Sequence, residues 1–464
     1  MTKTGHFRLF TSLSNLIIKI CLAWIQGAGP AEELMNLTLI RGGDLIDPVG
    51  ETVEKVDLLI EKGKISKIFP RGVFKEKSPR ISVVEASDRF VIPGLIDMHV
   101  HLREPGQEYK ETVATGARSA AAGGYTAIAC MPNTEPPNDC RSVTEFILEQ
   151  AKKAGSAKVY PIAAISKGQM GKTLTNFGEL REAGAVGVSD DGFPVANTGL
   201  MRRALEQASF YGLKVISHCE DRSLSGDGVM HEGVVSTRIG LAGIPAASED
   251  IMVYREIALS KLTGCPVHIA HVSTAGSVEL IKRAKEEGVL VTAETAPHYF
   301  SLDHGAVVGY DTVFKVNPPL RTDKDVEAIK EGLAKGVIDV IATDHAPHSA
   351  LEKDLEFDKA AFGMIGLQTA LPLTLKLVRE GILSLTEAIG KLSSNGADII
   401  GISGGRLVEG GDADLAIIDP EYEYLFEEDQ ILSKSRNSPF IGTRLKGRNE
   451  LTMVGGKIVW EKES

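Results

Sequence analysis

Short apolar runs alternate with longer amphipathic stretches through the middle of the chain. Eight of the runs are rich in β-branched residues and have strand length. They span residues 91–100, 125–131, 158–165, 185–190, 214–218, 266–271, 289–295 and 337–343. Strands that alternate with helix-length segments predict parallel strands joined by helical crossovers. Eight such units are what a closed (β/α)8 TIM barrel requires, so we predict one over residues 89–403.

The two ends of this region have a different pattern. Short β-type runs separated by turns occupy residues 37–40, 56–60 and 65–68, and glycine-rich segments at 404–419 and 452–460 have the same texture. This pattern is typical of hairpin strands. We therefore predict that residues 35–88 and 404–464 together form one small β-sandwich, which makes the chain an α/β protein with a TIM barrel and a second, smaller domain.

Residues 1–34 do not continue either pattern. The apolar run from Leu13 to Trp24 contains Lys19 and is too short to span a bilayer. A secretory signal is one interpretation of it. We favour a disordered N-terminal extension or a misassigned start, because a clean strand follows Met35.

Composition narrows the class of protein. The chain is 43% hydrophobic and 24% charged, which is ordinary for a globular enzyme. Its net charge of −11 gives no basic surface for nucleic acid, and favours a small-molecule substrate. Five scattered cysteines without C-x-x-C spacing argue against a disulfide framework or a thiolate zinc site. We expect a cytoplasmic protein without a membrane partner.

Polar residues follow five of the eight predicted strands. They include His99 and His101 after the first strand, then Asp190-Asp191, His218, His268 with His271, and Asp344-His345. Catalytic groups of a TIM barrel lie at the carboxyl ends of its strands. Each group alone would also fit a solvated strand end, but together they predict a metal site. Imidazole and carboxylate ligands suit zinc or a similar divalent ion.

Strand alternation selects among neighbouring candidates. Side chains two apart share a face, so Gly187, Ser189 and Asp191 face inward and Asp191 is preferred to Asp190. Either His268 or His271 could face inward, and we prefer His271 because it lies nearer the strand end. On the last strand Asp344 faces inward and His345 faces a helix.

These motifs resemble a known family. The run Pro93-Gly94-Leu95-Ile96-Asp97-Met98-His99-Val100-His101 is similar to that of metal-dependent amidohydrolases. Four further motifs resemble those of dihydroorotases: His101-Leu102-Arg103-Glu104-Pro105-Gly106, Met131-Pro132-Asn133-Thr134, Val316-Asn317-Pro318-Pro319-Leu320-Arg321 and Asp344-His345-Ala346-Pro347-His348. The resemblance runs from about Met35 to the C-terminus. The fourth strand ends in two aspartates, whereas many relatives have a carboxylated lysine there. In this respect the chain resembles the bacterial type I dihydroorotases, in which an aspartate takes the place of that lysine.

The resemblance implies zinc-dependent, reversible cyclisation of N-carbamoyl-L-aspartate to L-dihydroorotate, in de novo pyrimidine (UMP) biosynthesis. It assigns one zinc ion to His99, His101, Asp191 and Asp344, and a second to Asp191, His218 and His271. One or two ions are therefore expected, with two favoured. Asp344 is also expected to accept a proton from water and deliver it to the leaving ring nitrogen.

The resemblance also implies a substrate site. Arg103 and Asn133 would bind the substrate carboxylate, and the remaining expected contacts are His101, Asn317, His348, Phe362 and Gly363. Taken alone, the two asparagines and Gly363 fit turn positions equally well. The charged stretch 349–361 is expected to form a lid, although such stretches are usually just solvated.

Two other functions fit parts of the sequence. A cyclic amidohydrolase of hydantoin, dihydropyrimidine or allantoin is the nearest enzyme, but Arg103 and Asn133 favour an acidic substrate. A catalytically silent homologue acting as a scaffold is the other, although all six expected metal ligands are present. On the basis of the resemblance we also consider a homo-oligomer and an association with aspartate carbamoyltransferase. No motif of the chain indicates either assembly.

Overall fold

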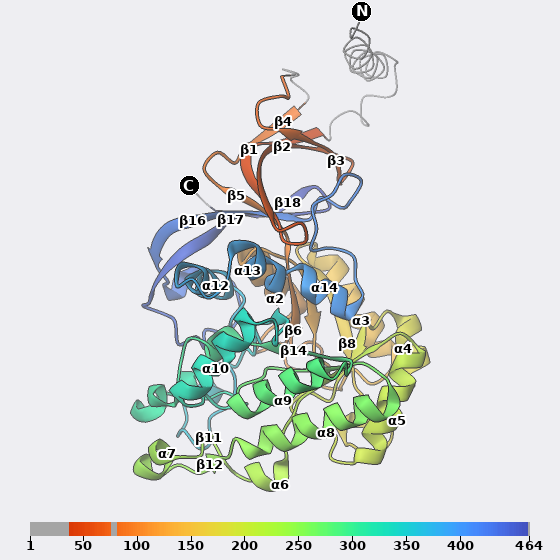
Figure 1. The fold of residues 1–464 in the computed structure, drawn as a ribbon, viewed down its shortest axis with the longest axis vertical. Coiled ribbons are helices and arrows are strands. Elements are labelled where there is room, and N and C mark those ends of the chain that lie inside the picture. The colour runs from red at the N-terminus through yellow and green to blue at the C-terminus, as the bar shows by residue number, and fades with distance from the viewer. Residues whose placement is uncertain (1–36, 76–80, 463–464) are drawn as a thin grey trace, which may run out of the picture.

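The computed structural model describes residues 37–75 and 81–462, so the predicted extension 1–34 lies outside the described residues. The molecule has a β-sheet unit at one end and a larger barrel of strands and helices at the other (Figure 1). None of the helices within the described ranges is long and apolar enough to cross a membrane.

The barrel contains eight parallel strands, as the sequence pattern predicts. In the order in which they pair, they are β15 (Val340–Ile341), β14 (Val291–Thr295), β13 (Val267–Ile269), β10 (Lys214–Ser217), β9 (Gly187–Val188), β8 (Lys158–Ala163), β7 (Tyr125–Cys130) and β6 (Leu95–Val100). A bridge between Val100 and His345 joins the two end strands, and the His101 N–H donates to the His345 carbonyl across 2.8 Å. The predicted TIM barrel is therefore confirmed.

The first predicted strand, residues 91–100, is in fact two strands. Gly94 separates β6 from β5 (Phe90–Pro93), which pairs with strands of the end sheet instead. A Cβ atom at Gly94 would lie 2.1 Å from Oγ1 of Thr126, so only glycine allows this close approach. Both strands are buried, and the apolar pattern therefore does not reveal the division.

Helices cover the barrel strands. The main ones are α2 (Val113–Ala122), α3 (Arg141–Ala154), α4 (Phe177–Ala183), α5 (Thr198–Phe210), α8 (Ala247–Thr263), α9 (Ala275–Glu286), α10 (Asp323–Ala334), α12 (Ala370–Arg379), α13 (Leu385–Leu392) and α14 (Ser394–Ile400). Local sequence sets several ends: the Thr274 side chain accepts from the Ser277 N–H at the start of α9, and left-handed Gly264 ends α8. Shorter helices in the loops include α6 (Arg222–Ser225), α7 (Val234–Ile239) and α11 (Ala350–Lys353).

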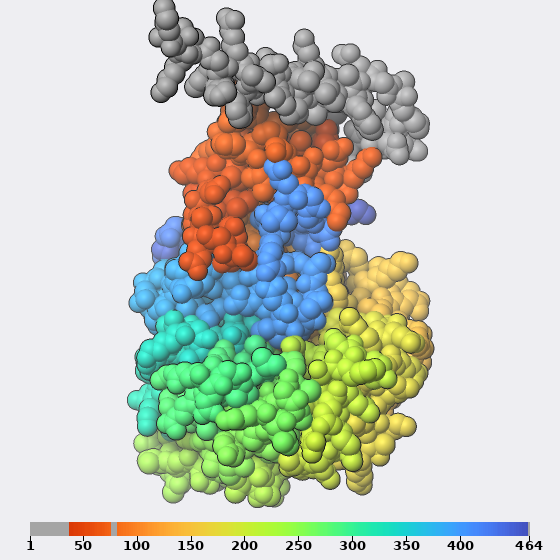
Figure 2. Space-filling view, turned by 45° about the vertical axis from the view of Figure 1, so that its right-hand side comes forward, coloured from red at the N-terminus to blue at the C-terminus, as the bar shows by residue number. Residues whose placement is uncertain are grey.

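Both chain ends build the second unit, as predicted. Its strands are β1 (Leu37–Asp47), β2 (Thr52–Glu61), β3 (Lys64–Pro70), β4 (Ile81–Glu85), β5, β16 (Leu415–Leu425), β17 (Arg444–Val454) and β18 (Lys457–Glu461), all in one hydrogen-bonded, mainly antiparallel sheet. Leu58 and Ile60 from one end share a buried core with Leu415 and Met453 from the other. Figure 2 shows these N-terminal and C-terminal segments packed together above the barrel.

The connection between β16 and β17 leaves the end sheet and contacts the barrel loops. The Ser435 hydroxyl donates to the Lys110 carbonyl across 2.7 Å, and the Ser433 hydroxyl donates to Glu111. The C-terminal part of the chain therefore reaches the loops that follow the barrel strands, where the candidate site lies.

Candidate active site

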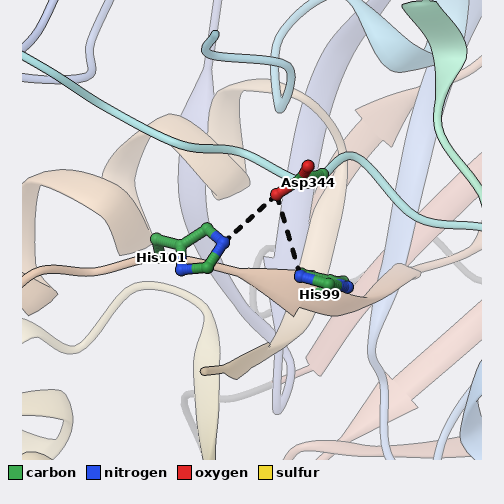
Figure 3. Close-up of side chains that lie close together, drawn as sticks. All are labelled: His99, His101 and Asp344. Carbon is green, nitrogen blue, oxygen red and sulfur yellow. Dashed lines mark hydrogen bonds and ion pairs between the residues drawn. The ribbon is translucent and has the colours of Figure 1, made fainter. Parts of the chain in front are cut away.

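Three of the expected metal ligands converge where β6 and β15 end (Figure 3). Oδ1 of Asp344 lies 3.1 Å from Nε2 of His101 and 3.7 Å from Nε2 of His99. All three side chains are buried. The backbone of Asp344 is left-handed, with φ at +49°. This uncommon conformation costs about 1–3 kcal/mol and is maintained by the surrounding structure.

Asp191 lies at the centre of four imidazoles. Its Oδ1 is 3.5 Å from Nε2 of His99, 3.5 Å from Nδ1 of His218 and 3.3 Å from Nε2 of His271. Its Oδ2 is 3.5 Å from Nε2 of His101. Oδ1 therefore faces three of the imidazoles and Oδ2 faces the fourth, so this one carboxylate contacts the histidines of both expected metal positions.

His218 and His271 meet beside this carboxylate. Nδ1 of His218 lies 2.8 Å from Nε2 of His271. One ligand atom each from His99, Asp191 and His271 lie within 4.8 Å of one another, as do those from His99, His101 and Asp344. The structure thus brings together all six residues that the sequence suggested as metal ligands.

The donor set fits a divalent metal ion. Nε2 of His99 is buried and has no hydrogen-bond partner within the described residues, although it faces two carboxylates. Burial alone would raise the pKa of Asp191, but the charge of His99 and hydrogen bonds from His218 and His271 hold it well below its usual value. An anionic carboxylate among imidazoles is the chemistry that zinc and similar ions select.

Glu294 is a site residue that the sequence analysis missed. Its Oε1 accepts a hydrogen bond from Nδ1 of His99 across 2.5 Å, and its Oε2 lies 3.3 Å from Nε2 of His268. Nδ1 of His268 is in turn 2.8 Å from the Thr292 hydroxyl. His268 therefore has a supporting position behind the site. The available signal was the one charged residue inside the predicted strand 289–295.

Glu220 supports a second ligand in the same way. Its Oε2 accepts a hydrogen bond from Nε2 of His218 across 3.0 Å, which turns Nδ1 of that ring toward Asp191. The same oxygen accepts from Nδ2 of Asn317 across 3.0 Å. Burial would raise the pKa of Glu220, but His218 lowers it strongly. Asn317, expected to contact substrate, is thus hydrogen-bonded to a residue that orients a ligand.

Strand alternation places Asp190 and His345 outside the metal site, and both side chains point away from it. Asp190 accepts hydrogen bonds from the backbone and hydroxyl of Ser166, and its burial raises its pKa to about 6. His345 faces Glu111, with Nε2 at 3.4 Å from Oε2, at the start of the α2 region. Both side chains therefore lie outside the group of ligand candidates.

Arg103, His348 and Asn133 border the ligand group. Nη2 of Arg103 lies 3.2 Å from Nε2 of His348, and its Nε donates to the Pro347 carbonyl across 3.2 Å. Asn133 accepts a hydrogen bond from Nδ1 of His101 across 2.8 Å, leaving Nε2 of that ring to face Asp344. Arg103 and Asn133 are both expected to contact substrate. In this structure Arg103 contacts the loop that carries His348, and Asn133 is hydrogen-bonded to the expected ligand His101.

Phe362 and Gly363 lie beside the loop that carries His348. The Gly363 N–H donates to the Lys315 carbonyl across 2.8 Å, and the Gly363 carbonyl accepts from Lys353 and Asn437. Both polar backbone groups of Gly363 are therefore already hydrogen-bonded. The Phe362 ring packs 4.4 Å from the Lys315 ammonium.

Asn437 was also missed by the sequence analysis. It lies in the β16–β17 connection, and its side chain accepts from the His348 N–H and donates to the Ala346 and Gly363 carbonyls. Nothing local in the sequence indicates this contact, because the residue belongs to a segment predicted to be part of the β-sandwich.

Sequence and structure comparisons relate this chain to known proteins. A family model described as "Dihydro-orotase-like" matches residues 88–277. The chain is 53% identical to a dihydroorotase of Geobacter metallireducens, over 92% of this chain and all of the relative. It is 54% identical to one of Pelotomaculum thermopropionicum, over 91% of this chain and 98% of the relative.

The chain belongs to the dihydroorotase family. The resemblance noted in the sequence and the expected enzyme class, a cyclic amide hydrolase, are thereby confirmed. Among solved structures, an L-hydantoinase from Arthrobacter aurescens has a TM-score of 0.81 and 27% identity, over 92% of this chain and 96% of that chain. A dihydropyrimidinase from Brevibacillus agri, with a TM-score of 0.78 and 22% identity, shares the fold over 92% of this chain and 95% of that chain.

Proposed function

We propose that this chain catalyses the reversible, zinc-dependent cyclisation of N-carbamoyl-L-aspartate to L-dihydroorotate, as a step of de novo pyrimidine (UMP) biosynthesis in the cytoplasm. The observation that carries the proposal is the position of Asp191, whose carboxylate lies within 3.5 Å of four imidazoles and beside a second aspartate, Asp344. The names of the relatives support the choice of substrate.

Two zinc ions fit the ligands. His99, His101, Asp191 and Asp344 would hold one, and Asp191, His218 and His271 would hold the other. Bound zinc supplies a water whose pKa is lowered to ~7 and polarises a carbonyl group. The side chain of aspartate is shorter than that of a carboxylated lysine. Occupancy of the second zinc position must therefore be measured by metal analysis.

Asp344 is the proposed proton carrier. In the hydrolytic direction its carboxylate accepts a proton from the attacking water and then donates it to the ring nitrogen as the amide bond breaks. Burial would raise the pKa of Asp344, but hydrogen bonding to His101 and the charge of His99 lower it, so the group is ionised and able to accept. General base and acid catalysis of this kind contributes typically ~10²–10⁴-fold.

Arg103 and Asn133 are the proposed partners of the substrate carboxylate, with His101, Asn317, His348, Phe362 and Gly363 around the ring. Arginine can bind a carboxylate through two parallel hydrogen bonds, which fixes orientation as well as adding energy. Burial and the charge of Arg103 lower the pKa of His348 to about 2, so this ring is neutral beside the guanidinium. The segment 349–361 remains a proposed lid.

Metal analysis combined with substrate comparison tests the proposal. The purified protein should contain one or two zinc ions per chain and should convert dihydroorotate much faster than hydantoin, which has no free carboxylate. Chelation should abolish turnover and added zinc should restore it. Full activity without bound metal would refute the zinc mechanism, and preference for hydantoin would refute the substrate.

The quaternary state is a separate proposal. The resemblance noted in the sequence suggests a homo-oligomer and an association with aspartate carbamoyltransferase, and the described surface identifies neither interface. Light scattering of the purified chain, alone and mixed with that transferase, would show whether either assembly forms.

A further inference from the structure

We propose that Lys353 is a positioning residue of the substrate site, whose ammonium group holds the Phe362–Gly363 segment against the segment that leads into Asn317. The inference rests on the proposed function, because it takes these two segments as parts of the substrate pocket. Lys353 itself would touch neither substrate nor metal.

The ammonium of Lys353 is surrounded by backbone carbonyls. Lys353 is the last residue of α11 and only 7% exposed. Its Nζ donates to the carbonyls of Ala361 at 2.8 Å, Gly363 at 3.0 Å and Lys315 at 3.4 Å. An ammonium has three N–H donors, so these three carbonyls use its whole donor capacity. No carboxylate within the described residues forms an ion pair with it.

These carbonyls belong to two segments that carry expected substrate contacts. Lys315 lies two residues before Asn317, and Ala361 and Gly363 flank Phe362. Lys353 itself follows His348 by five residues. The segment before Asn317 and two nearby parts of the stretch 348–363 are therefore joined at a single buried charge.

The backbone at Gly363 leaves little room for displacement. Its φ is +138°, and a Cβ atom there would lie 2.7 Å from Cβ of Ala346 and 3.1 Å from the His348 ring. Its N–H donates to the same Lys315 carbonyl that Lys353 contacts. Loss of the ammonium would release the Gly363 carbonyl on one side, and any shift of this segment would reach His348 directly.

Burial of a charged side chain at Lys353 lowers the free energy of unfolding. Burial and the nearby Lys315 charge lower the pKa of Lys353 to about 7, which shows that the environment disfavours the ammonium. An apolar side chain would avoid that desolvation penalty, although it would leave carbonyls without donors. The three carbonyl contacts explain why a lysine occupies the position, and positioning of the pocket explains what the contacts achieve.

Substitution of Lys353 by methionine tests the inference in the full-length, zinc-loaded protein. Lys353→Met should raise KM for dihydroorotate roughly tenfold or more, because the variant loses the charged hydrogen-bond donor that holds the Phe362–Gly363 segment in place. Zinc content and kcat should stay within about twofold of wild type, because the residue touches no ligand of the metal. Lys359→Met is the matched control: this lysine is on the same segment but is exposed and pairs with Glu356, so KM should not change.

Amide hydrogen exchange provides a readout that does not depend on turnover. Exchange of residues 361–364 should be faster in Lys353→Met than in wild type and unchanged in Lys359→Met. If the wild type fails to convert dihydroorotate, the proposed function is wrong and the exchange measurement still decides the role of Lys353. If Lys353→Met does not fold, Lys353→Arg should show the same faster exchange, because a planar guanidinium cannot reproduce the three contacts. Wild-type KM and wild-type exchange in a folded variant would overturn the inference.

Discussion

His99 on β6 donates a hydrogen bond to Glu294 on β14 across 2.5 Å, from Nδ1 to Oε1. Nε2 of the same ring faces Asp191 and Asp344, and with the proton held on Nδ1 it is the atom that would offer its lone pair to a bound metal ion. A carboxylate in this position fixes both the tautomer and the orientation of a ligating imidazole. Glu294 is buried and also faces His268, so the candidate ligand His99 is supported by a chain of buried contacts.

Replacing Glu294 with glutamine should weaken zinc binding by roughly 10–100-fold, the usual effect of losing such a supporting carboxylate. The amide keeps the size of the side chain but carries no charge to stabilise the Nδ1–H of His99. Chelator competition would measure the zinc affinity, and circular dichroism would confirm the fold. Thr292→Val is the control, since Thr292 contacts His268 and not His99; an equal loss in both variants would contradict a specific role for Glu294.

Asp191 and its neighbour Asp190 provide a matched pair. Asp191→Asn should remove zinc from at least one position and abolish turnover, because its carboxylate faces four imidazoles. Asp190→Asn should retain zinc and activity, since its side chain is hydrogen-bonded to Ser166. Metal content measured by atomic emission would distinguish the two. Loss of zinc in the Asp190 variant alone would reverse the assignment.

Strand alternation explains why so much of the candidate site could be predicted from sequence. The period of two places Asp191 inward and Asp190 outward whatever the rest of the chain does. The rule that barrel strands carry chemistry at their carboxyl ends then brings His99, His218 and Asp344 together without any knowledge of loop structure.

The remaining features depend on contacts that local pattern does not encode. Arg103, His271 and Asp344 have positive φ values of 62°, 33° and 49°, which these residue types adopt only when surrounding structure compensates. Glu294 and Asn437 act through side-chain contacts to distant segments. The division at Gly94 was hidden because the residues on both sides of it are equally buried.

Zinc binding should release protons in a way that depends on pH. Burial alone would lower the pKa of His218, but Asp191 and Glu220 raise it from 6.5 to about 9 in the metal-free protein. A zinc ligand must be neutral, so binding at pH 7 displaces this proton, and apparent affinity should increase as pH rises toward 9. Titration calorimetry in buffers of different ionisation enthalpy would count the protons released.

The same pKa shift has a consequence for the stability of the metal-free protein. Because the folded pKa of His218 is raised, its contribution is fully present below pH 6.5 and is lost as pH rises through about 9. Thermal unfolding of the metal-free protein should therefore occur at lower temperature at pH 9.5 than at pH 6.5. Glu220→Gln should make this dependence smaller, since it removes one of the two anions; an unchanged dependence would argue against His218 as its source.

Arg103→Met should mainly impair binding of the acidic substrate. Loss of a charged hydrogen-bond donor costs about 1.5–3 kcal/mol, which corresponds to a rise in KM of roughly ten- to a hundredfold. Steady-state kinetics with dihydroorotate would separate this rise from any change in kcat. Arg202→Met, at an exposed helical position paired with Glu206, should leave both constants unchanged. A KM equal to wild type in Arg103→Met would exclude the guanidinium from carboxylate binding.

Asp344→Asn tests the proton carrier most directly. An amide cannot accept the proton of the attacking water, so kcat should fall by roughly 10²–10⁴-fold while the fold is preserved. Asp339→Asn is a suitable control because Asp339 precedes β15, at the opposite end from Asp344, and pairs with Lys285. Since Asp344 is also an expected ligand, zinc content must be measured with turnover: a large drop in kcat with at least one zinc retained supports proton transfer, whereas near wild-type turnover would remove Asp344 from that role.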